Sequence, residues 1–378
     1  MRSIVIAGYA RSPFTLANRG ALMRVRPDDM AAQVVSALIE RTRVRPQDIE
    51  DLIVGCAFPE SEQGLNIGRL IALLAGLPPS VAGMTVNRFC GSSMQSVHIA
   101  AGQIGLGAGE VFIAAGVESM SRVPMMGFNP LPNPAMQSKA PAAYISMGDT
   151  AENVVSKWDI SRSEQEAFAV RSQQRAASAA SAGHFAAELV PVAATDASVE
   201  SDGCIRPDTT AAGLAQLKPT FAQNGTVTAG TSSPLTDGAS AVLICSEDYA
   251  IRQGLTPLAR IRSVAVAGCA PEIMGIGPVA ATQKALQRAN LDIAAIDVVE
   301  LNEAFASQAL ACARELGIRD ETLNIDGGAI ALGHPLGATG ARIVGKAATL
   351  LQRVGGRYAL ATQCIGGGQG IATILERI

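Results

Sequence analysis

Apolar and polar positions follow one another along this 378-residue chain in two blocks that repeat each other. Residues 37–58 and 285–305 each have the pattern of a helix end, a polar turn, a hydrophobic strand and a final Ala-Phe pair, at an offset of 247 to 248 residues. At that offset, the segment from Cys90 through the apolar strand 111–116 falls on residues 337–363. Duplication explains two blocks with one offset better than chance similarity does.

Each half therefore predicts the order strand, helix, strand, helix, strand, with a last strand at 241–245 or 371–375. A helix between two apolar strands implies parallel crossovers and a sheet that is covered on both faces. The apolar run from Met1 to Tyr9 is too short for a signal peptide and predicts a first strand. The pattern as a whole indicates an α/β protein.

The first half carries about a hundred extra residues between Ser119 and Thr236, rich in Pro, Ser and Ala. This insertion predicts a helix over 163–182, which Ser161 and Glu164 begin with a capping box. Insertions of this size usually have a function, so we expect a substrate-covering domain. The expected division of the chain is 1–118 plus 237–250, 119–236, and 251–378.

Composition, charge and cysteine spacing limit the kinds of protein that this chain can be. The net charge of −3 and the absence of a basic run give no reason to expect a nucleic-acid partner. No apolar window reaches the 18 residues of a membrane span. The seven cysteines include no CxxC pair, which argues against a disulfide framework or a zinc site and favours a reducing compartment. We expect a soluble, cytoplasmic protein.

Cys90 stands between a short β-like segment, 84–86, and a helical pattern that follows it. A helix start favours an anion, and together with a nearby imidazole it can lower the pKa of a thiol and create a nucleophile. The alternative is a buried structural cysteine, which is what most lone cysteines are.

Three further clusters follow the ends of predicted strands, where sites in open α/β sheets usually lie. They are Asn302 to Phe305, the glycine-rich stretch 327–340 that we expect to enter a helix at Ala341, and 364–370 after a strand at 358–362. The glycines suit a loop whose backbone approaches a ligand or an oxyanion. Of the three histidines, His98 reads as structural and His184 as solvent-exposed, which leaves His334 as the catalytic candidate.

At these residues the chain resembles the thiolase family, and most of all the degradative 3-ketoacyl-CoA thiolases. Five motifs carry the resemblance: VNRFCGSSMQ at 86–95, TVTAGTSSPLTDGAS at 226–240, LNEAFA at 301–306, GGAIALGHPLGATGAR at 327–342 and CIGGGQG at 364–370. The resemblance implies a duplicated, five-layered α-β-α-β-α fold with an inserted loop domain. It also implies CoA-dependent thiolytic cleavage of 3-ketoacyl-CoA to acetyl-CoA and a shortened acyl-CoA.

The resemblance also implies residue roles. Cys90 would be the nucleophile that holds the acyl group, and Cys364 the acid/base. His334 would polarise Cys90 and form an oxyanion site with a water held by Asn302, while the N–H groups of Cys90 and Gly366 would form a second. Substrate and CoA contacts would come from Met147, Arg206, Leu217, Phe221, Ser233, Ala304 and Phe305.

CoA would then be a cosubstrate, with no tightly bound cofactor and no metal. The family implies a homodimer or homotetramer, and a multifunctional β-oxidation enzyme as a further partner. One departure concerns subclass: Ser146 to Gly148 and Thr231 to Ser233 stand where short-chain biosynthetic thiolases have His-Met-Gly and Asn-Ala-Ser.

This departure favours the degradative class over the alternative, a short-chain acetoacetyl-CoA thiolase. A decarboxylating ketosynthase-type enzyme is disfavoured by Cys364, and a non-catalytic CoA-binding subunit by the intact catalytic positions.

Overall fold

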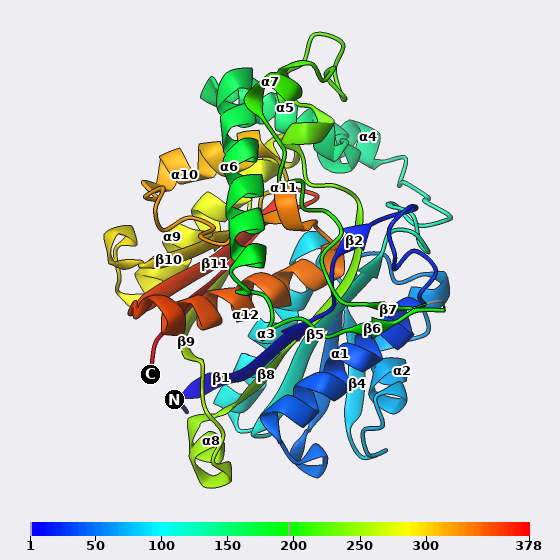
Figure 1. Ribbon diagram of the computed structural model, residues 1–378, viewed down its shortest axis with the longest axis vertical. Coiled ribbons are helices and arrows are strands. Elements are labelled where there is room, and N and C mark those ends of the chain that lie inside the picture. Colours follow the sequence, from blue (N-terminus) through cyan, green and yellow to red (C-terminus); the bar gives the residue numbers. More distant parts are fainter. Residues whose placement is uncertain (1, 196) are drawn as a thin grey trace.

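The computed structural model describes residues 2–195 and 197–378, and its core is a sheet of ten described strands built from two blocks (Figure 1). The first block runs in the order β1 (Ile4–Arg11), β8 (Thr236–Ser246), β5 (Val111–Ser119), β3 (Asp51–Gly55), β4 (Ala82–Val86). The second runs in the order β9 (Ala259–Gly268), β12 (Gln369–Glu376), β11 (Tyr358–Ile365), β10 (Val298–Leu301).

A short antiparallel contact between β1 and β9 joins the blocks, pairing Val5 with Arg260 and Ile6 with Ala259. The short strand β2 (Thr15–Leu16) pairs with β8. β1 is the first strand that the sequence predicts, although Met1 lies outside the described residues.

The two blocks share one topology. In the first, β3 is parallel to β4 and β5, whereas β8 and β1 are antiparallel additions. In the second, β10 is parallel to β11, and β12 and β9 are antiparallel additions. The place of β4 is taken there by an isolated parallel bridge between Val299 and Leu323. The parallel crossovers expected from the repeat are therefore present in both halves.

Three apolar clusters divide the molecule into layers. One outer cluster packs α1 (Pro27–Thr42) and α2 (Ile67–Leu74) on the first block, and another packs α9 (Gly277–Ala289) and α10 (Ala306–Leu316) on the second. The middle cluster holds α3 (Ser92–Leu106) and α12 (Leu336–Val354) between the blocks. Because the central strands, such as β5, β8 and β11, are buried on both faces, helices cover both sides. The predicted five-layered α-β-α-β-α fold is confirmed.

The central helix α12 begins at Leu336, so the prediction of a helix start at Ala341 is wrong. Gly337 and Gly340 lie inside its first turns, where close packing explains why both residues are glycine. A Cβ on Gly337 would stand 2.4 Å from the Val117 carbonyl oxygen, and one on Gly340 would stand 2.2 Å from the Met94 nitrogen. These glycines allow close helix packing, not a close approach to a ligand.

The insertion between β5 and β8 contains most of the remaining elements. The predicted helix is α6 (Arg162–Ser181), and its capping box of Ser161 and Glu164 is confirmed. The insertion also holds α4 (Met136–Lys139), η4 (Pro141–Tyr144), α5 (Met147–Trp158), β6 (Val192–Ala193), β7 (Ser198–Val199), α7 (Ala211–Ala215) and η5 (Ala229–Thr231). Elsewhere lie η1 (Pro46–Asp48), η2 (Ser61–Gln63), η3 (Phe89–Gly91), α8 (Glu247–Gln253), η6 (Pro271–Ile276), η7 (Ile293–Ala295) and α11 (Ala329–Leu332).

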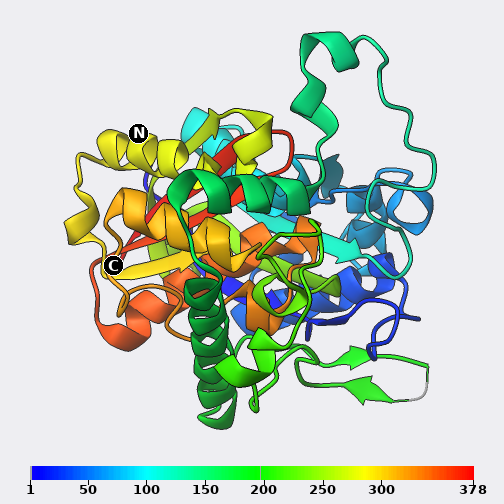
Figure 2. The same cartoon turned by 90° about the horizontal axis from the view of Figure 1, so that it is seen from above.

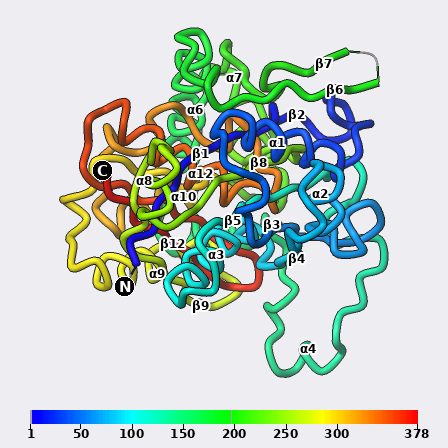
Figure 3. The backbone as a smooth tube through the Cα atoms, turned by 90° about the horizontal axis from the view of Figure 1, so that it is seen from below, coloured from blue at the N-terminus to red at the C-terminus, as the bar shows by residue number. Residues whose placement is uncertain are grey.

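Although it belongs to the first half in sequence, the insertion packs on the second: α5 and α6 contact α10, and α6 contacts α11 (Figure 2). The segment around α4 projects away from the body (Figure 3). A buried charge network also fastens the insertion. Glu188 accepts from Arg11 on β1 at 2.7 Å and lies 3.2 Å from Lys346 on α12. Removing one member of such a network leaves a buried charge unpaired, which is strongly destabilising.

None of the described helices is long and apolar enough to cross a membrane.

Candidate active site

Cys90 lies in a tight turn between β4 and α3. The short helix η3 (Phe89–Gly91) contains it, and Phe89 has a φ of +42°, a left-handed conformation that is rare for a bulky residue. Asn87 holds this turn: its Oδ1 accepts from the Phe89 N–H at 2.9 Å, and its Nδ2 donates to the Ala57 carbonyl at 3.0 Å. Strain of this kind costs about 1–3 kcal/mol and tends to occur at functional sites.

The end of β11 from the other half meets this turn. The side-chain amide of Gln363 donates to the Cys90 carbonyl, and the Ile365 side chain packs directly on Gly91. The sequence placed Cys364 after a strand that ends at 362, which is wrong because β11 extends to Ile365 and contains it. Gly366 follows β11 at once, and Gly367 and Gly368 close the turn to β12 with φ of +79° and +84°.

Burial raises the pKa of the Cys90 thiol to about 11, although the N–H groups of Gly366 and of Cys90 itself favour the thiolate. The expectation of a lowered pKa is therefore wrong, because desolvation outweighs these donors. Cys90 carries its proton at neutral pH. Any attack by its sulfur then requires a base.

The thiol of Cys364 also remains protonated. Its pKa is raised well above the usual value, first by burial and then by the negative charge of a Cys90 thiolate. The residues around Cys364 contact the Cys90 turn directly: Gln363 donates to the Cys90 carbonyl, and the Gly366 N–H is directed at the Cys90 sulfur. The two cysteines, from opposite halves of the chain, therefore share one site.

His334 lies just before α12, buried, with its ring held on both sides. Its Nδ1 is 2.6 Å from Thr339 Oγ1 and its Nε2 is 3.4 Å from Asn302 Nδ2. Burial, and then the positive charge of Arg342, lower the pKa of His334 to about 3, so the ring is neutral. Leu336, two residues on, packs in the same small apolar cluster as Cys90. This contact brings the α12 start to the Cys90 turn.

An apolar cavity of about 350 Å³ opens beside Cys90. Its wall comes from five segments: the loop after β3, the Cys90 turn, the α12 start, the β11–β12 turn and the insertion. The residues that form it include Phe58, Phe89, Met125, Leu131, Tyr144, Met147, Leu336 and Gly366. A mostly apolar pocket with a few polar groups at one end is the usual form of a small-molecule site.

Two known protein-family domains match the chain, one over each half. The family described as Thiolase, N-terminal domain, matches residues 4–248, and the one described as Thiolase, C-terminal domain, matches residues 255–377. The chain belongs to the thiolase family. It is 48% identical over 389 aligned residues to the 3-ketoacyl-CoA thiolase of Bacillus subtilis (strain 168), covering 100% of both chains. It is 49% identical over 391 residues to that of Aeromonas salmonicida (strain A449), again covering 100% of both.

Most predicted substrate contacts of this thiolase gather around Cys364. Ala304 and Phe305 share its apolar cluster, and Met147 packs against that cluster. The Phe221 ring meets Phe305 edge-on, with centroids 5.9 Å apart, and Ser233 Oγ donates to the Ala304 carbonyl at 3.1 Å.

Two predicted contacts have other surroundings. The Leu217 side chain is 37% exposed and lies beside Gly230. Arg206 is exposed, and its N–H donates to Gln173 Oε1 at 2.7 Å.

The other two histidines have different surroundings. His98 Nε2 is 2.9 Å from Thr373 Oγ1, and burial lowers its pKa to about 3, as suits a structural polar residue. His184 is 38% exposed on its side chain, and it also lies 3.5 Å from Asp326. The expectation that His184 faces solvent therefore describes only part of its environment.

Sequence reasoning missed two residues that build the site. Glu118 is buried and accepts from the N–H groups of Ala57 at 2.8 Å and Gly337 at 2.9 Å, which ties the β3 end to the α12 start. Its signal was a carboxylate at the end of an otherwise apolar strand. Thr339 was hidden inside a motif in which only the histidine drew notice.

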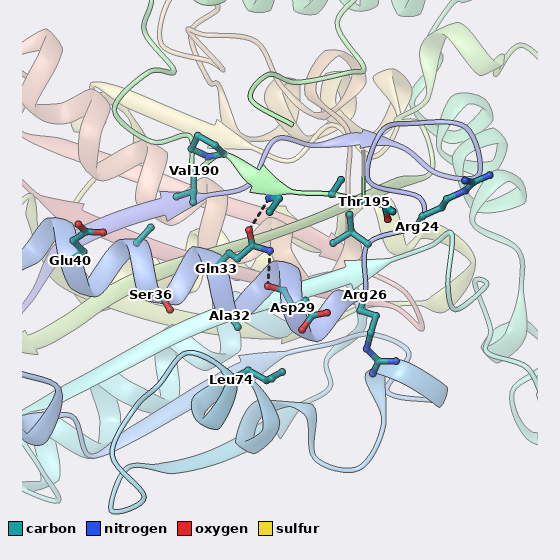
Figure 4. A pocket seen from close by; sticks show the side chains of 15 residues that line it. Arg24, Arg26, Asp29, Ala32, Gln33, Ser36, Glu40, Leu74, Val190 and Thr195 are labelled. Atoms are coloured by element: carbon teal, nitrogen blue, oxygen red, sulfur yellow. Dashed lines mark hydrogen bonds between the residues drawn. The ribbon is translucent and has the colours of Figure 1, made fainter. Parts of the chain in front are cut away.

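A separate hollow lies along α1, beside the β6–β7 hairpin (Figure 4). Gln33 crosses one side of it, where its Oε1 accepts from the Ala193 N–H at 2.8 Å. The predicted catalytic and CoA-binding residues are not among those that line it. No group of three or more His, Cys, Asp or Glu that could hold a metal ion was found within 2–195 and 197–378.

Proposed function

We propose that this thiolase cleaves 3-ketoacyl-CoA with free CoA, giving acetyl-CoA and an acyl-CoA shortened by two carbons, through an acyl thioester on Cys90. The observation that carries the proposal is the contact of the Cys364 segment with the Cys90 turn from the opposite half, through the bond from Gln363 to the Cys90 carbonyl and the Gly366 N–H directed at Cys90. The names of relatives that match over the full chain support the same activity.

In the first step, Cys90 is the nucleophile. Burial disfavours both a free Cys90 thiolate and a charged His334 ring, so the thiol gives its proton to His334 only as the sulfur attacks the 3-keto carbon. The bond between C2 and C3 then breaks. The electron pair of that bond goes to C2 and forms the enolate of acetyl-CoA. Covalent catalysis of this kind divides a difficult transfer into two easier ones.

Two oxyanion sites hold the charge. The N–H groups of Cys90 and Gly366 face the keto oxygen. His334 and a water held by Asn302 face the thioester oxygen of the enolate. Asn302 Oδ1 is buried and finds no hydrogen-bond partner within the described chain, so it is available to a water. Losing one such donor typically costs about 10²–10³ in rate.

Cys364 moves the other proton. Because its thiol is protonated, it can donate to C2 of the enolate and release acetyl-CoA. The resulting Cys364 thiolate takes the proton of an incoming CoA thiol, and the CoA sulfur attacks the Cys90 thioester. Cys90 leaves as a thiolate and recovers its proton from His334, which restores the starting state.

The cavity supports the degradative subclass. Its wall presents aromatic and aliphatic side chains, including Phe58, Leu131 and Tyr144, to the space beside Cys90. Each buried methylene contributes about 0.8 kcal/mol, so a longer alkyl chain gains affinity there. The short-chain, acetoacetyl-specific alternative has no use for this space. CoA serves as cosubstrate without a tightly bound cofactor, in contact with Met147, Arg206, Leu217, Phe221, Ser233, Ala304 and Phe305.

We also propose the division of the chain into 1–118 plus 237–250, 119–236 and 251–378, and a cytoplasmic homodimer or homotetramer. β4 supports self-association, because it ends the sheet and is only partly buried. A multifunctional β-oxidation enzyme is a further proposed partner.

A steady-state assay tests the function. With CoA, 3-ketoacyl-CoA substrates of four to sixteen carbons should each release one acetyl-CoA, and kcat/KM should rise from the four-carbon substrate to the longer ones. Turnover of the four-carbon substrate alone would favour the acetoacetyl-specific alternative. Binding without turnover of any substrate would contradict the proposal.

A further inference from the structure

The hydroxyl of Thr339 lies between the ring of His334 and the backbone that follows it. Thr339 is in the first turn of α12 and is completely buried. Its Oγ1 is 2.6 Å from His334 Nδ1 and 3.0 Å from the carbonyl oxygen of Pro335. The second contact is the bond that a helical threonine makes to the residue four positions earlier.

Counting protons assigns these contacts. A threonine hydroxyl has one proton and a carbonyl oxygen can only accept, so we assign this proton to the contact with the Pro335 carbonyl. The hydroxyl oxygen then accepts from the ring, so Nδ1 of His334 carries the imidazole proton. The lone pair of Nε2 faces Asn302 Nδ2, which is a donor. In the resting state each donor therefore meets an acceptor, in the series Asn302, His334, Thr339 and Pro335. The lone pair of Nε2 takes the Cys90 proton once the Asn302 N–H leaves it.

We propose that Thr339 is a positioning residue that fixes the imidazole proton of His334 on Nδ1 and so leaves Nε2 able to take the proton of Cys90. The inference rests on the proposed function, because it concerns the base that the Cys90 thiol needs. It adds a residue to that function and a specific starting state of the ring.

The opposite tautomer would disable this step. With the proton on Nε2, the ring would present a donor to Cys90, and no lone pair would be available to accept the thiol proton. A free histidine side chain favours that tautomer, with the proton on Nε2. Because His334 is buried, water cannot supply the missing partner at Nδ1, and the nearby hydroxyl decides the outcome.

The first test observes the tautomer directly. The full-length protein is labelled with ¹⁵N-histidine, and long-range ¹H–¹⁵N spectra at neutral pH report which ring nitrogen carries the proton. The variants His98→Gln and His184→Asn each remove one of the other two signals and so assign His334. Wild type and Thr339→Ser should carry the proton on Nδ1, and Thr339→Val should carry it on Nε2. A proton on Nε2 in the wild type would overturn the proposal.

The second test measures the effect on Cys90. Alkylation of Cys90 by iodoacetamide, followed by mass spectrometry, should slow by about tenfold to a hundredfold in Thr339→Val, the effect of leaving one buried ring nitrogen unpaired. Thr339→Ser keeps the hydroxyl and should stay within about threefold of wild type. An alkylation rate in Thr339→Val equal to that of wild type would also overturn the proposal.

Neither measurement involves substrate, so the outcomes separate the two proposals. A chain with the proton on Nδ1 and no thiolytic activity would contradict the proposed function alone. An active thiolase with the proton on Nε2 would contradict the role of Thr339 alone. If Thr339→Val does not fold, the spectra of wild type and Thr339→Ser still decide.

Discussion

The two halves place different residues at the same point of the same topology. At the ends of the parallel strands, Gly55 pairs with Gly116 in the first half. Their counterparts, 247 residues later, are Asn302 and Gln363, and the Asn302 N–H donates to the Thr362 carbonyl beside them. The first pair has no side chains, whereas the second contributes an amide next to His334 and an amide bonded to the Cys90 carbonyl.

Packing explains the difference. A Cβ on Gly55 would stand 2.3 Å from the Ser93 nitrogen, and one on Gly116 would stand 2.1 Å from the Gly337 carbonyl oxygen. The starts of both central helices, α3 and α12, therefore close the end of the first block. The end of the second block remains free to carry chemistry. Duplication produced two equivalent pairs of strand ends. Close packing requires glycine at the pair in the first block, so only the pair in the second block can carry functional side chains.

The largest expected effect comes from Cys364, the proposed acid/base of the second half. Cys364→Ala should reduce thiolysis by about 10²–10⁴-fold, because the enolate then lacks its proton donor. Steady-state release of acetyl-CoA measures it. Cys245→Ala removes a buried thiol of the first half and should keep turnover near that of wild type. Normal turnover in Cys364→Ala would exclude this residue from the mechanism.

The next largest effect is expected at Asn302, at the end of β10. Asn302→Ala makes this position resemble its counterpart Gly55 and should lower kcat by about 10²–10³-fold, since the proposed oxyanion site would lose its support. KM for CoA should change little. A loss confined to KM would place Asn302 in substrate binding instead.

Adding a side chain at the strand ends of the first block should affect stability more than catalysis. Gly116→Ala forces the α12 start to move and should lower the free energy of unfolding by about 1–3 kcal/mol. Gly102→Ala is the matched control: its Cβ would enter open space on α3, and helix propensity should raise stability by about 0.5–1 kcal/mol. Denaturant titrations measure both, and an unchanged midpoint for Gly116→Ala would refute the packing argument.

The smallest effect concerns pH. The folded state lowers the pKa of His98 to about 3. Between about pH 6 and pH 3 only the unfolded chain binds this proton, so the free energy of unfolding decreases as the pH is lowered. His98→Gln can keep the contact with Thr373 and cannot titrate. Its stability relative to wild type should therefore improve by about 1.4 kcal/mol per pH unit between pH 6 and 4. A pH-independent difference would contradict burial of a neutral imidazole.

Local patterns were enough to predict much of this fold. The repeat predicted the crossovers, the apolar runs predicted the strands, and Ser161 with Glu164 located a helix start. What failed depended on distant contacts. Gly337 and Gly340 were assigned to a loop because the contacts that require glycine there, with β5 and α3, involve residues more than 200 positions away in the chain. The pKa of Cys90 was misjudged because its burial involves side chains that are distant in the sequence, such as Phe58 and Leu336.

The same limit applies to the site. Motifs brought Cys90, His334, Asn302 and Cys364 to notice one at a time. The contacts that hold them, from Gln363 to the Cys90 carbonyl and from Thr339 to His334, became visible only in three dimensions.

The most direct measurement of the central claim is the mass of the protein after incubation with acetyl-CoA. Wild type and Cys364→Ala should both gain one acetyl group on the peptide that contains Cys90, and Cys90→Ala should gain none. A persistent acetyl adduct in Cys90→Ala would contradict the account, since the acyl group would then be held elsewhere.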